Sequence, residues 1–158
     1  MQMYQNGDKI VYPLYGAGVI EGIEDKEIDG ELQTYYVLNI PVGNLKIMIS
    51  AAKAEGQRVR LIHSAEDIRA IISNAREIVM PDNWNQRYKE NMERIKSGEL
   101  SQVAIVFYNL LLRERERGLS TAEKKMMTTA KQIILTELIL SQEVEKEEAE
   151  GLLSRAFE

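Results

Sequence analysis

The chain of 158 residues is long enough for one domain or two small ones, and its 44% hydrophobic and 28% charged residues are ordinary for a globular protein. It has no cysteine and a single histidine, His63, which excludes disulfides, thiolate metal sites and histidine clusters. The start, MQMYQNGDK, lacks a secretory signal pattern, and the most apolar stretch, VAIVFYNLLL, is far shorter than the roughly 20 residues of a membrane span. We therefore expect a cytoplasmic protein that contacts no membrane.

The net charge of −5 hides a basic block in the middle of the chain. Residues 82–131 carry ten basic and seven acidic residues, whereas residues 132–158 carry two basic and seven acidic residues. Such a block can mark a nucleic-acid contact, but a charge run on helices is usually a solvated face, so by itself it is weak evidence.

The first third of the chain predicts short antiparallel strands. The stretches DKIVYP, GVIEGIED, LQTYYVLNI and LKIMIS are rich in β-branched and aromatic residues, and glycines punctuate them. Asp29–Gly30 suits a tight hairpin turn, and Pro41–Asn44 gives a second turn. Four or five such strands in roughly 50 residues predict a small, strongly bent antiparallel β-barrel of the SH3 or Tudor kind, a fold that binds more often than it catalyses.

The hydrophobic period changes from strand to helix near His63. Ser64 and Ser120 begin capping boxes, Pro81 cannot continue a helix, and Gly98 and Gly118 supply helix stops. These signals predict helices over about 64–76, 84–97, 101–117 and 120–140, with a last one in the acidic tail. The sequence therefore predicts an α+β fold, with the barrel in residues 1–62 and a helical domain of about five helices in residues 63–158.

Motifs for catalysis are missing from the sequence. It contains no GxGxxG, Walker A or GxSxG pattern and no zinc-ligand spacing. The glycines of YGAGVIEG lie between strands, so we interpret them as allowing a tight bend and not as a phosphate cradle. His63, at the expected domain junction, is interpreted as structural. We expect a protein that is not an enzyme and uses no metal or cofactor.

The single tryptophan, Trp84, opens the predicted basic helix and allows two interpretations. One is that it tops an apolar stripe at helical spacing, formed by Trp84, Tyr88, Met92 and Ile95. The other is that Arg87 and Lys89 flank an exposed indole, because cations can meet phosphates while the ring stacks on a base or wedges beside it. The residues alone leave both interpretations open.

Three stretches of this sequence resemble the CarD/CdnL family of bacterial transcription regulators. They are NGDKIVYPLYGAGVIEGIE, NWNQRYKENMERIKSGEL and RERERGLSTAEKKMMTTAKQ, and the similarity runs from about Tyr4 into the acidic tail. The first stretch is also similar to the polymerase-interacting module of transcription-repair coupling ATPases. The other two stretches, together with the missing ATPase motif, favour the free-standing regulators.

The resemblance implies a Tudor-like domain that docks on the β subunit of RNA polymerase and a helical domain that binds promoter DNA. It implies that Trp84 wedges into the minor groove at the upstream fork of the bubble and so stabilises the open complex. It further implies a monomer that associates with the nucleoid through the polymerase. The competing interpretation is a non-DNA-binding protein–protein adaptor related to the coupling-factor module, with Trp84 in its core.

Carried over residue by residue, the resemblance also implies contact positions. The expected phosphate contacts are Arg87, Lys89, Lys124 and Lys125, with Tyr88 packed beneath the indole. The expected polymerase-facing edge contains Lys26, Ile28 and Met48. Two residues stand where the resemblance leads us to expect arginine: Gln86, which weakens the basic cluster, and Met48, which removes an ion pair at the polymerase surface.

Overall fold

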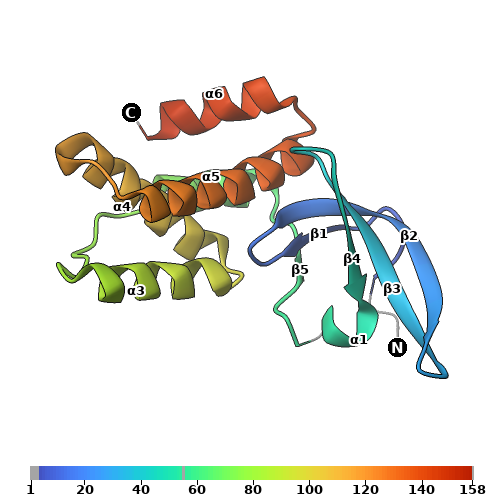
Figure 1. Cartoon of the computed structure of the whole chain (residues 1–158). Coiled ribbons are helices and arrows are strands. Elements are labelled where there is room, and N and C mark those ends of the chain that lie inside the picture. Colours follow the sequence, from blue (N-terminus) through green and yellow to red (C-terminus); the bar gives the residue numbers. More distant parts are fainter. Residues whose placement is uncertain (1–3, 55, 158) are drawn as a thin grey trace.

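The computed structural model describes residues 4–54 and 56–157, so residues 1–3, 55 and 158 of the two predicted domains lie outside the description. One antiparallel sheet contains β1 (Lys9–Tyr12), β2 (Gly16–Ile28), β3 (Glu31–Ile40), β4 (Leu45–Ser50) and β5 (Arg60–Leu61), with the short helix α1 (Ala51–Ala54) after β4. The remaining helices are α2 (Ala65–Ser73), α3 (Trp84–Lys96), α4 (Leu100–Arg117), α5 (Thr121–Gln142) and α6 (Lys146–Ala156). The predicted α+β fold, with five helices after the sheet, is confirmed (Figure 1).

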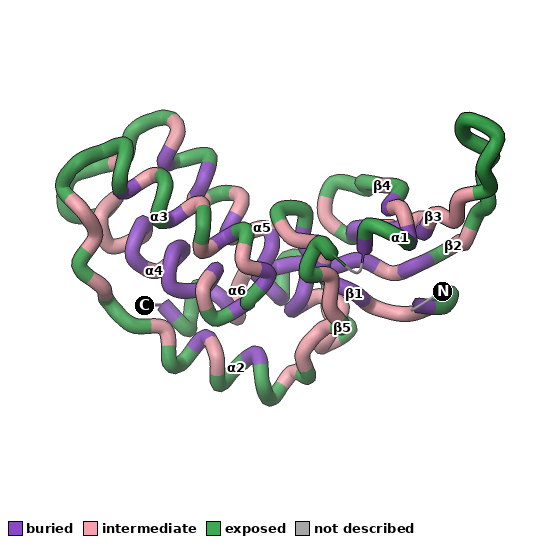
Figure 2. The backbone as a smooth tube through the Cα atoms, turned by 90° about the horizontal axis from the view of Figure 1, so that it is seen from below, coloured by how far each residue is buried: buried purple, intermediate pink, exposed green. Residues whose placement is uncertain are grey.

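The strand order is β4-β3-β2-β1-β5, so the last strand returns to pair with the first, as in Tudor-like domains. The turn between β2 and β3 has positive φ at both Asp29 (52°) and Gly30 (81°), as a tight two-residue hairpin requires. The tip of this hairpin extends away from the rest of the chain and is exposed on all sides (Figure 2). It therefore offers both faces of two strands to a partner.

Capping side chains fix where the helices begin. The hydroxyl of Ser64 accepts a hydrogen bond from the backbone of Asp67 at 3.1 Å, and the side chain of Asn83 accepts one from the backbone of Gln86 at 3.0 Å. Helix α2 ends at Ser73, earlier than the predicted Arg76, because the Asn74 amide group donates to the carbonyl of Ala70 and closes the last turn. The predicted starts at Trp84 and near Ser120 are confirmed.

The described residues form two separate hydrophobic cores, one within the sheet and one among the helices. Helix α5 joins them, because residues 133–138 are buried around the whole circumference of the helix. Gly16 allows this contact: a Cβ there would lie 2.5 Å from Thr136 Oγ1, and the same hydroxyl accepts a hydrogen bond from the backbone of Ala17 at 2.8 Å. Gly16 and Gly18 therefore serve close packing, a structural role that differs from the tight bend interpreted from the sequence.

A buried carboxylate ties the two parts together. Glu137 of α5 is fully buried and accepts hydrogen bonds from both terminal nitrogens of Arg60, at 2.9 and 2.8 Å, and from the backbone of His63 at 2.8 Å. His63 Nδ1 lies 3.0 Å from the same carboxylate, so this histidine is structural, as predicted. The division into residues 1–62 and 63–158 falls between β5 and α2 and stays a prediction. Within the described ranges, no helix is both long and apolar enough to cross a bilayer.

Candidate nucleic-acid interface

The indole of Trp84 lies at the surface, on the first turn of α3. The residue is 41% exposed, and its ring stacks on Tyr88 with centroids 5.3 Å apart and planes 19° apart. Tyr88 therefore packs beneath the indole, as expected. Farther along the stripe Met92 packs against the helical core and Ile95 is buried at 1% exposure, so the apolar stripe exists and Trp84 is its exposed end.

The hydroxyl of Ser120 holds the other side of the indole. Trp84 Nε1 donates to Ser120 Oγ at 3.1 Å, and the backbone of Glu123 donates to the same oxygen at 3.2 Å. The hydroxyl in turn donates to Glu123 Oε1 at 3.0 Å. A serine hydroxyl has one hydrogen to donate and two lone pairs, so all its bonding capacity is used. The ring of Trp84 is consequently fixed in direction although it is exposed.

Arg87 does not flank the indole as an open cation, contrary to expectation. It is only 4% exposed, and its Nε donates to Glu123 Oε2 at 2.8 Å while its Nη1 donates to the carbonyls of Pro81 and Asp82. A buried guanidinium needs such partners because an unpaired buried charge is very costly. In this conformation Arg87 has a structural role beneath the contact between Trp84 and Ser120, and its guanidinium is not accessible to a phosphate.

Glu123 links this pair to the serine that holds the indole. Burial alone raises the pKa of the Glu123 carboxyl, but hydrogen bonds from Arg87 and Ser120, together with the charge of the guanidinium, outweigh it and hold the pKa below its usual range. The carboxylate is therefore ionised at neutral pH. A chain of four side chains, Arg87, Glu123, Ser120 and Trp84, runs from the interior to the surface.

The three remaining predicted cations, Lys89, Lys124 and Lys125, are exposed. Lys89 lies on α3, and the two others lie near the start of α5, just beyond Ser120. The contact between Trp84 and Ser120 also brings the amino-terminal ends of these two helices together, and helix amino termini carry partial positive charge. Gln86 is exposed on the same first turn of α3 and adds no charge. The surface around the tryptophan is thus favourable for an anionic partner.

The predicted polymerase-facing residues gather on one face of the β2–β3–β4 strands. Lys26 Nζ lies 3.4 Å from Met48 Sδ, and Ile28 (39% exposed) and Met48 (43% exposed) leave apolar surface open. Lys26 is the one cation among six carboxylates in residues 21–31, EGIEDKEIDGE. Leu32 at the hairpin tip is 73% exposed and was not predicted from the sequence. Leu32 pairs with Glu27, so it lies on the opposite face of the hairpin from Lys26 and Ile28. We call the region of Lys26, Ile28 and Met48 the docking face.

Sequence reasoning missed the residues that support the site. The sequence predicted only the capping box that begins at Ser120, of which Glu123 is the second member, and nothing in the local pattern marked Glu137 or Thr136. Residues 133–138 of α5 are all buried. One signal could have predicted this: in the stretch ILTELIL, Thr136 and Glu137 are the only polar residues. For the described residues, no group of three or more acidic or histidine side chains is placed to hold a metal ion.

Comparison with known proteins agrees with these two structural parts. Residues 4–62 match the family model described as CarD-like/TRCF RID domain, and residues 68–154 match the model described as CarD, C-terminal domain. A relative from Bacillus subtilis (strain 168), named "Putative transcription factor YdeB", is 36% identical over 140 residues, which cover 86% of this chain and 90% of the relative. The chain therefore belongs to the CarD family.

Proposed function

We propose that this protein is a transcription regulator that bridges RNA polymerase and promoter DNA. The sheet docks on the β subunit through the docking face, and Trp84 wedges into the minor groove at the upstream fork of the melted bubble. Membership of the CarD family, a family of transcription factors and not of enzymes, supports a role in transcription, and the match at residues 4–62 supports an interaction with the polymerase.

The observation that carries the proposal is an exposed tryptophan held in one direction. An apolar ring costs free energy in water, and here Tyr88 and Ser120 present it at the surface between two helix amino termini. Apolar side chains inserted between base steps unstack them, and nearby lysines can neutralise phosphates without reading sequence. Because Arg87 is buried, the proposed phosphate contacts are the three exposed lysines, Lys89, Lys124 and Lys125.

A wedge stabilises the open complex only by its difference in affinity for open and closed DNA. A difference of about 1.4 kcal/mol changes the open-to-closed ratio roughly tenfold. Stacking of one base on an aromatic ring is worth about 1–3 kcal/mol, which is enough for a regulatory effect.

The competing function is a protein–protein adaptor that does not bind DNA. The match at residues 4–62 is compatible with both functions, because that model also covers the coupling-factor module. The match at residues 68–154 and the 41% exposure of Trp84 favour the DNA-binding function, since the adaptor interpretation placed the indole in the core.

The decisive variant is Trp84→Ala. We expect it to lose about 1–2 kcal/mol of stability, because one ring stack and one hydrogen bond disappear. We expect the open complex to dissociate about 5- to 150-fold faster after a competitor challenge, because the surface that holds the fork apart is gone. Binding to an isolated β subunit should not change.

A docking variant, Lys26→Glu with Ile28→Glu, is the matched control. Both residues are exposed, so the fold should persist while β-subunit binding and the effect on open complexes are lost together. A folded Trp84→Ala protein that protects open complexes as well as the native protein does would refute the wedge.

A further inference from the structure

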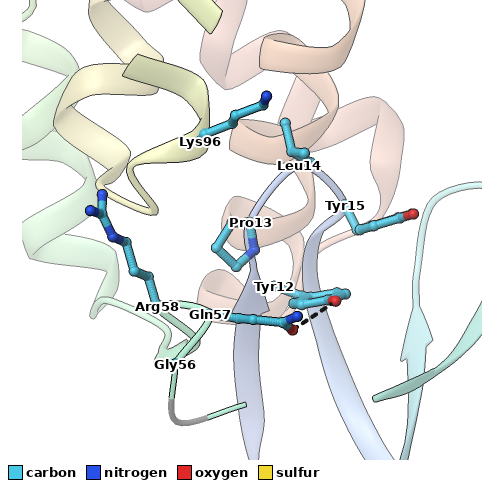
Figure 3. Close-up of a pocket in the computed structure, with 8 residues that line it drawn as sticks. All are labelled: Tyr12, Pro13, Leu14, Tyr15, Gly56, Gln57, Arg58 and Lys96. Atoms are coloured by element: carbon cyan, nitrogen blue, oxygen red, sulfur yellow. Dashed lines mark hydrogen bonds between the residues drawn. The ribbon is translucent and has the colours of Figure 1, made fainter. Parts of the chain in front are cut away.

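A second concave site lies where the sheet meets the helices. Its cavity of about 310 Å³ is formed by three segments: the turn between β1 and β2 (residues 12–15), the segment before β5 (residues 56–58) and Lys96 in the last turn of α3. Figure 3 shows Lys96 extending toward Leu14 and Arg58 standing on the opposite side, with Pro13 between them. We call it the junction pocket; it shares no residue with the surface around Trp84.

The junction pocket has an aromatic wall. The rings of Tyr12 and Tyr15 stack with centroids 5.3 Å apart and planes only 8° apart, and the Tyr12 hydroxyl donates to Gln57 Oε1 at 2.9 Å. Tyr15 remains 49% exposed, although it is an aromatic residue beside a cavity. A ring supported on one side and open to water is a suitable platform for a planar ligand.

The cations of the junction pocket are available to an outside anion. Arg58 and Lys96 are both exposed, and neither side chain forms a hydrogen bond or an ion pair with another of the described residues. No carboxylate is among the described residues that line the cavity. The pocket therefore combines aromatic stacking surface with uncompensated positive charge.

The backbone around the junction pocket is held in a rarely adopted conformation. Leu14 and Arg58 have φ of 75° and 58°, values that cost a bulky or long side chain about 1–3 kcal/mol. Gly98 allows the segments to approach, because a Cβ there would lie 3.1 Å from the Arg58 carbonyl and 3.5 Å from Pro13 Cγ. Arg60 Nε donates to the Gly98 carbonyl at 2.7 Å and fixes that approach. Strained backbone of this kind tends to occur at binding sites.

We propose that the junction pocket binds single-stranded DNA. An unpaired base stacks on the Tyr15–Tyr12 pair, and the adjoining phosphates lie against Arg58 and Lys96. A volume of about 310 Å³ is at the small end of ligand pockets, which suits one base. In a duplex the neighbouring base pairs cover each base face, so a duplex cannot present a face to Tyr15.

The position of the junction pocket relative to Trp84 indicates the source of that strand. Helix α3 begins at Trp84 and ends at Lys96, so the two sites lie at opposite ends of one helix, about 18 Å apart along its axis. A strand released at a fork beside Trp84 would reach the pocket within about five base steps at duplex spacing. This assignment of the strand rests on the proposed function, whereas the chemistry of the pocket does not.

The test is binding of labelled oligothymidylate to the full chain at low salt, measured by fluorescence anisotropy with duplex DNA and ATP as competitors. Arg58→Gln with Lys96→Gln should lower the slope of log affinity against log salt by about 1.4, because two phosphate contacts are lost. Tyr15→Ala should weaken binding about 5- to 150-fold without changing that slope. Arg69→Gln, an exposed arginine on α2, should change neither.

Several results would overturn the proposal. They are undetectable binding of the single strand, equal competition by duplex, competition by ATP as strong per nucleotide as by the oligomer, or pocket variants that weaken β-subunit binding and leave oligothymidylate binding intact. Trp84→Ala in the open-complex assay separates the two ideas. If Trp84→Ala shortens the open-complex lifetime but the pocket variants bind oligothymidylate normally, only the junction pocket is refuted. If Trp84→Ala leaves the lifetime unchanged but the pocket variants lose oligothymidylate binding, only the wedge is refuted.

Discussion

At the scale of single residues, substitutions of Arg87 and Lys89 should affect folding stability very differently although the two residues lie only two positions apart. Arg87 is buried and bonded to Glu123, so Arg87→Met leaves a buried carboxylate without its partner. Breaking a buried pair costs about 3–5 kcal/mol, which lowers the melting temperature by about 6–20 °C in a chain of this size. Lys89→Met, at an exposed position, should change stability by less than about 0.5 kcal/mol. Thermal and urea unfolding of the two variants measure the difference.

The two variants should also differ in DNA-dependent assays. Lys89→Met should weaken the response to promoter DNA and lower its salt dependence, because a phosphate contact is removed. Equal stability of Arg87→Met and the native protein would show that the guanidinium is not the structural group that its contacts indicate.

The Glu123 carboxyl makes the folding stability depend on pH. Its pKa is lower in the folded chain than in the unfolded chain, where glutamate titrates near about 4.3. The stabilisation is therefore present above that value and is lost as the pH falls through the folded pKa. Urea unfolding between neutral pH and about pH 3 should show a smaller acid-induced loss for Glu123→Gln than for the native chain. If the unfolding free energies of the two proteins fell in parallel with pH, Glu123 would not be the source of the acid-induced loss.

At the scale of elements, the contact between β2 and α5 depends on Gly16. This residue has φ of 107° and no room for a Cβ beside Thr136, so Gly16→Ala adds a clash to an unfavourable backbone conformation. Gly118, at the end of α4, has φ of 76° but open space around it. Gly118→Ala should cost about 1–2 kcal/mol, and Gly16→Ala about 1–3 kcal/mol more. Urea unfolding gives both values. Equal losses of unfolding free energy would mean that the sheet and α5 move apart at little cost to accommodate the added methyl group.

The elements also show what the sequence could predict. Capping and turn chemistry is local, so Ser64, Ser120 and Asp29–Gly30 were enough to locate two helix starts and the hairpin. The partner of Arg87 lies 36 residues away, and no periodic pattern encodes such a distance. For the same reason, spacing could not decide whether Trp84 is exposed. Its exposure depends on how far α5 covers the first turn of α3.

At the scale of the whole molecule, Glu137 connects two cores that otherwise belong to different parts of the chain. Its partners Arg60 and His63 lie 77 and 74 residues away. Glu137→Gln should cost about 2–4 kcal/mol, less than a fully buried pair because Arg60 keeps some contact with water. Unfolding of the helical core, followed by Trp84 fluorescence, should then separate from unfolding of the sheet. The sheet can be followed by the tyrosine signal in near-ultraviolet circular dichroism, because five of the seven tyrosines lie in residues 4–36.

Glu143→Gln is the control for that experiment. Glu143 also crosses the junction, to Lys9 at 3.5 Å, but its side chain is 81% exposed. Exposed pairs contribute about 0–1 kcal/mol, so this variant should unfold in one transition close to that of the native chain. A Glu137→Gln protein with the same midpoint as Glu143→Gln would show that the buried carboxylate does not hold the two parts together.

Trp84 is already confined to one conformation before any DNA arrives, between the ring of Tyr88 and the hydroxyl of Ser120. Immobilising a freely rotating side chain at an interface costs about 0.5–1.5 kcal/mol of conformational entropy. Here that entropy is lost when the chain folds, so it is not lost again when the indole meets a base. The same ring on a mobile loop would give a smaller net gain for each base that it stacks on.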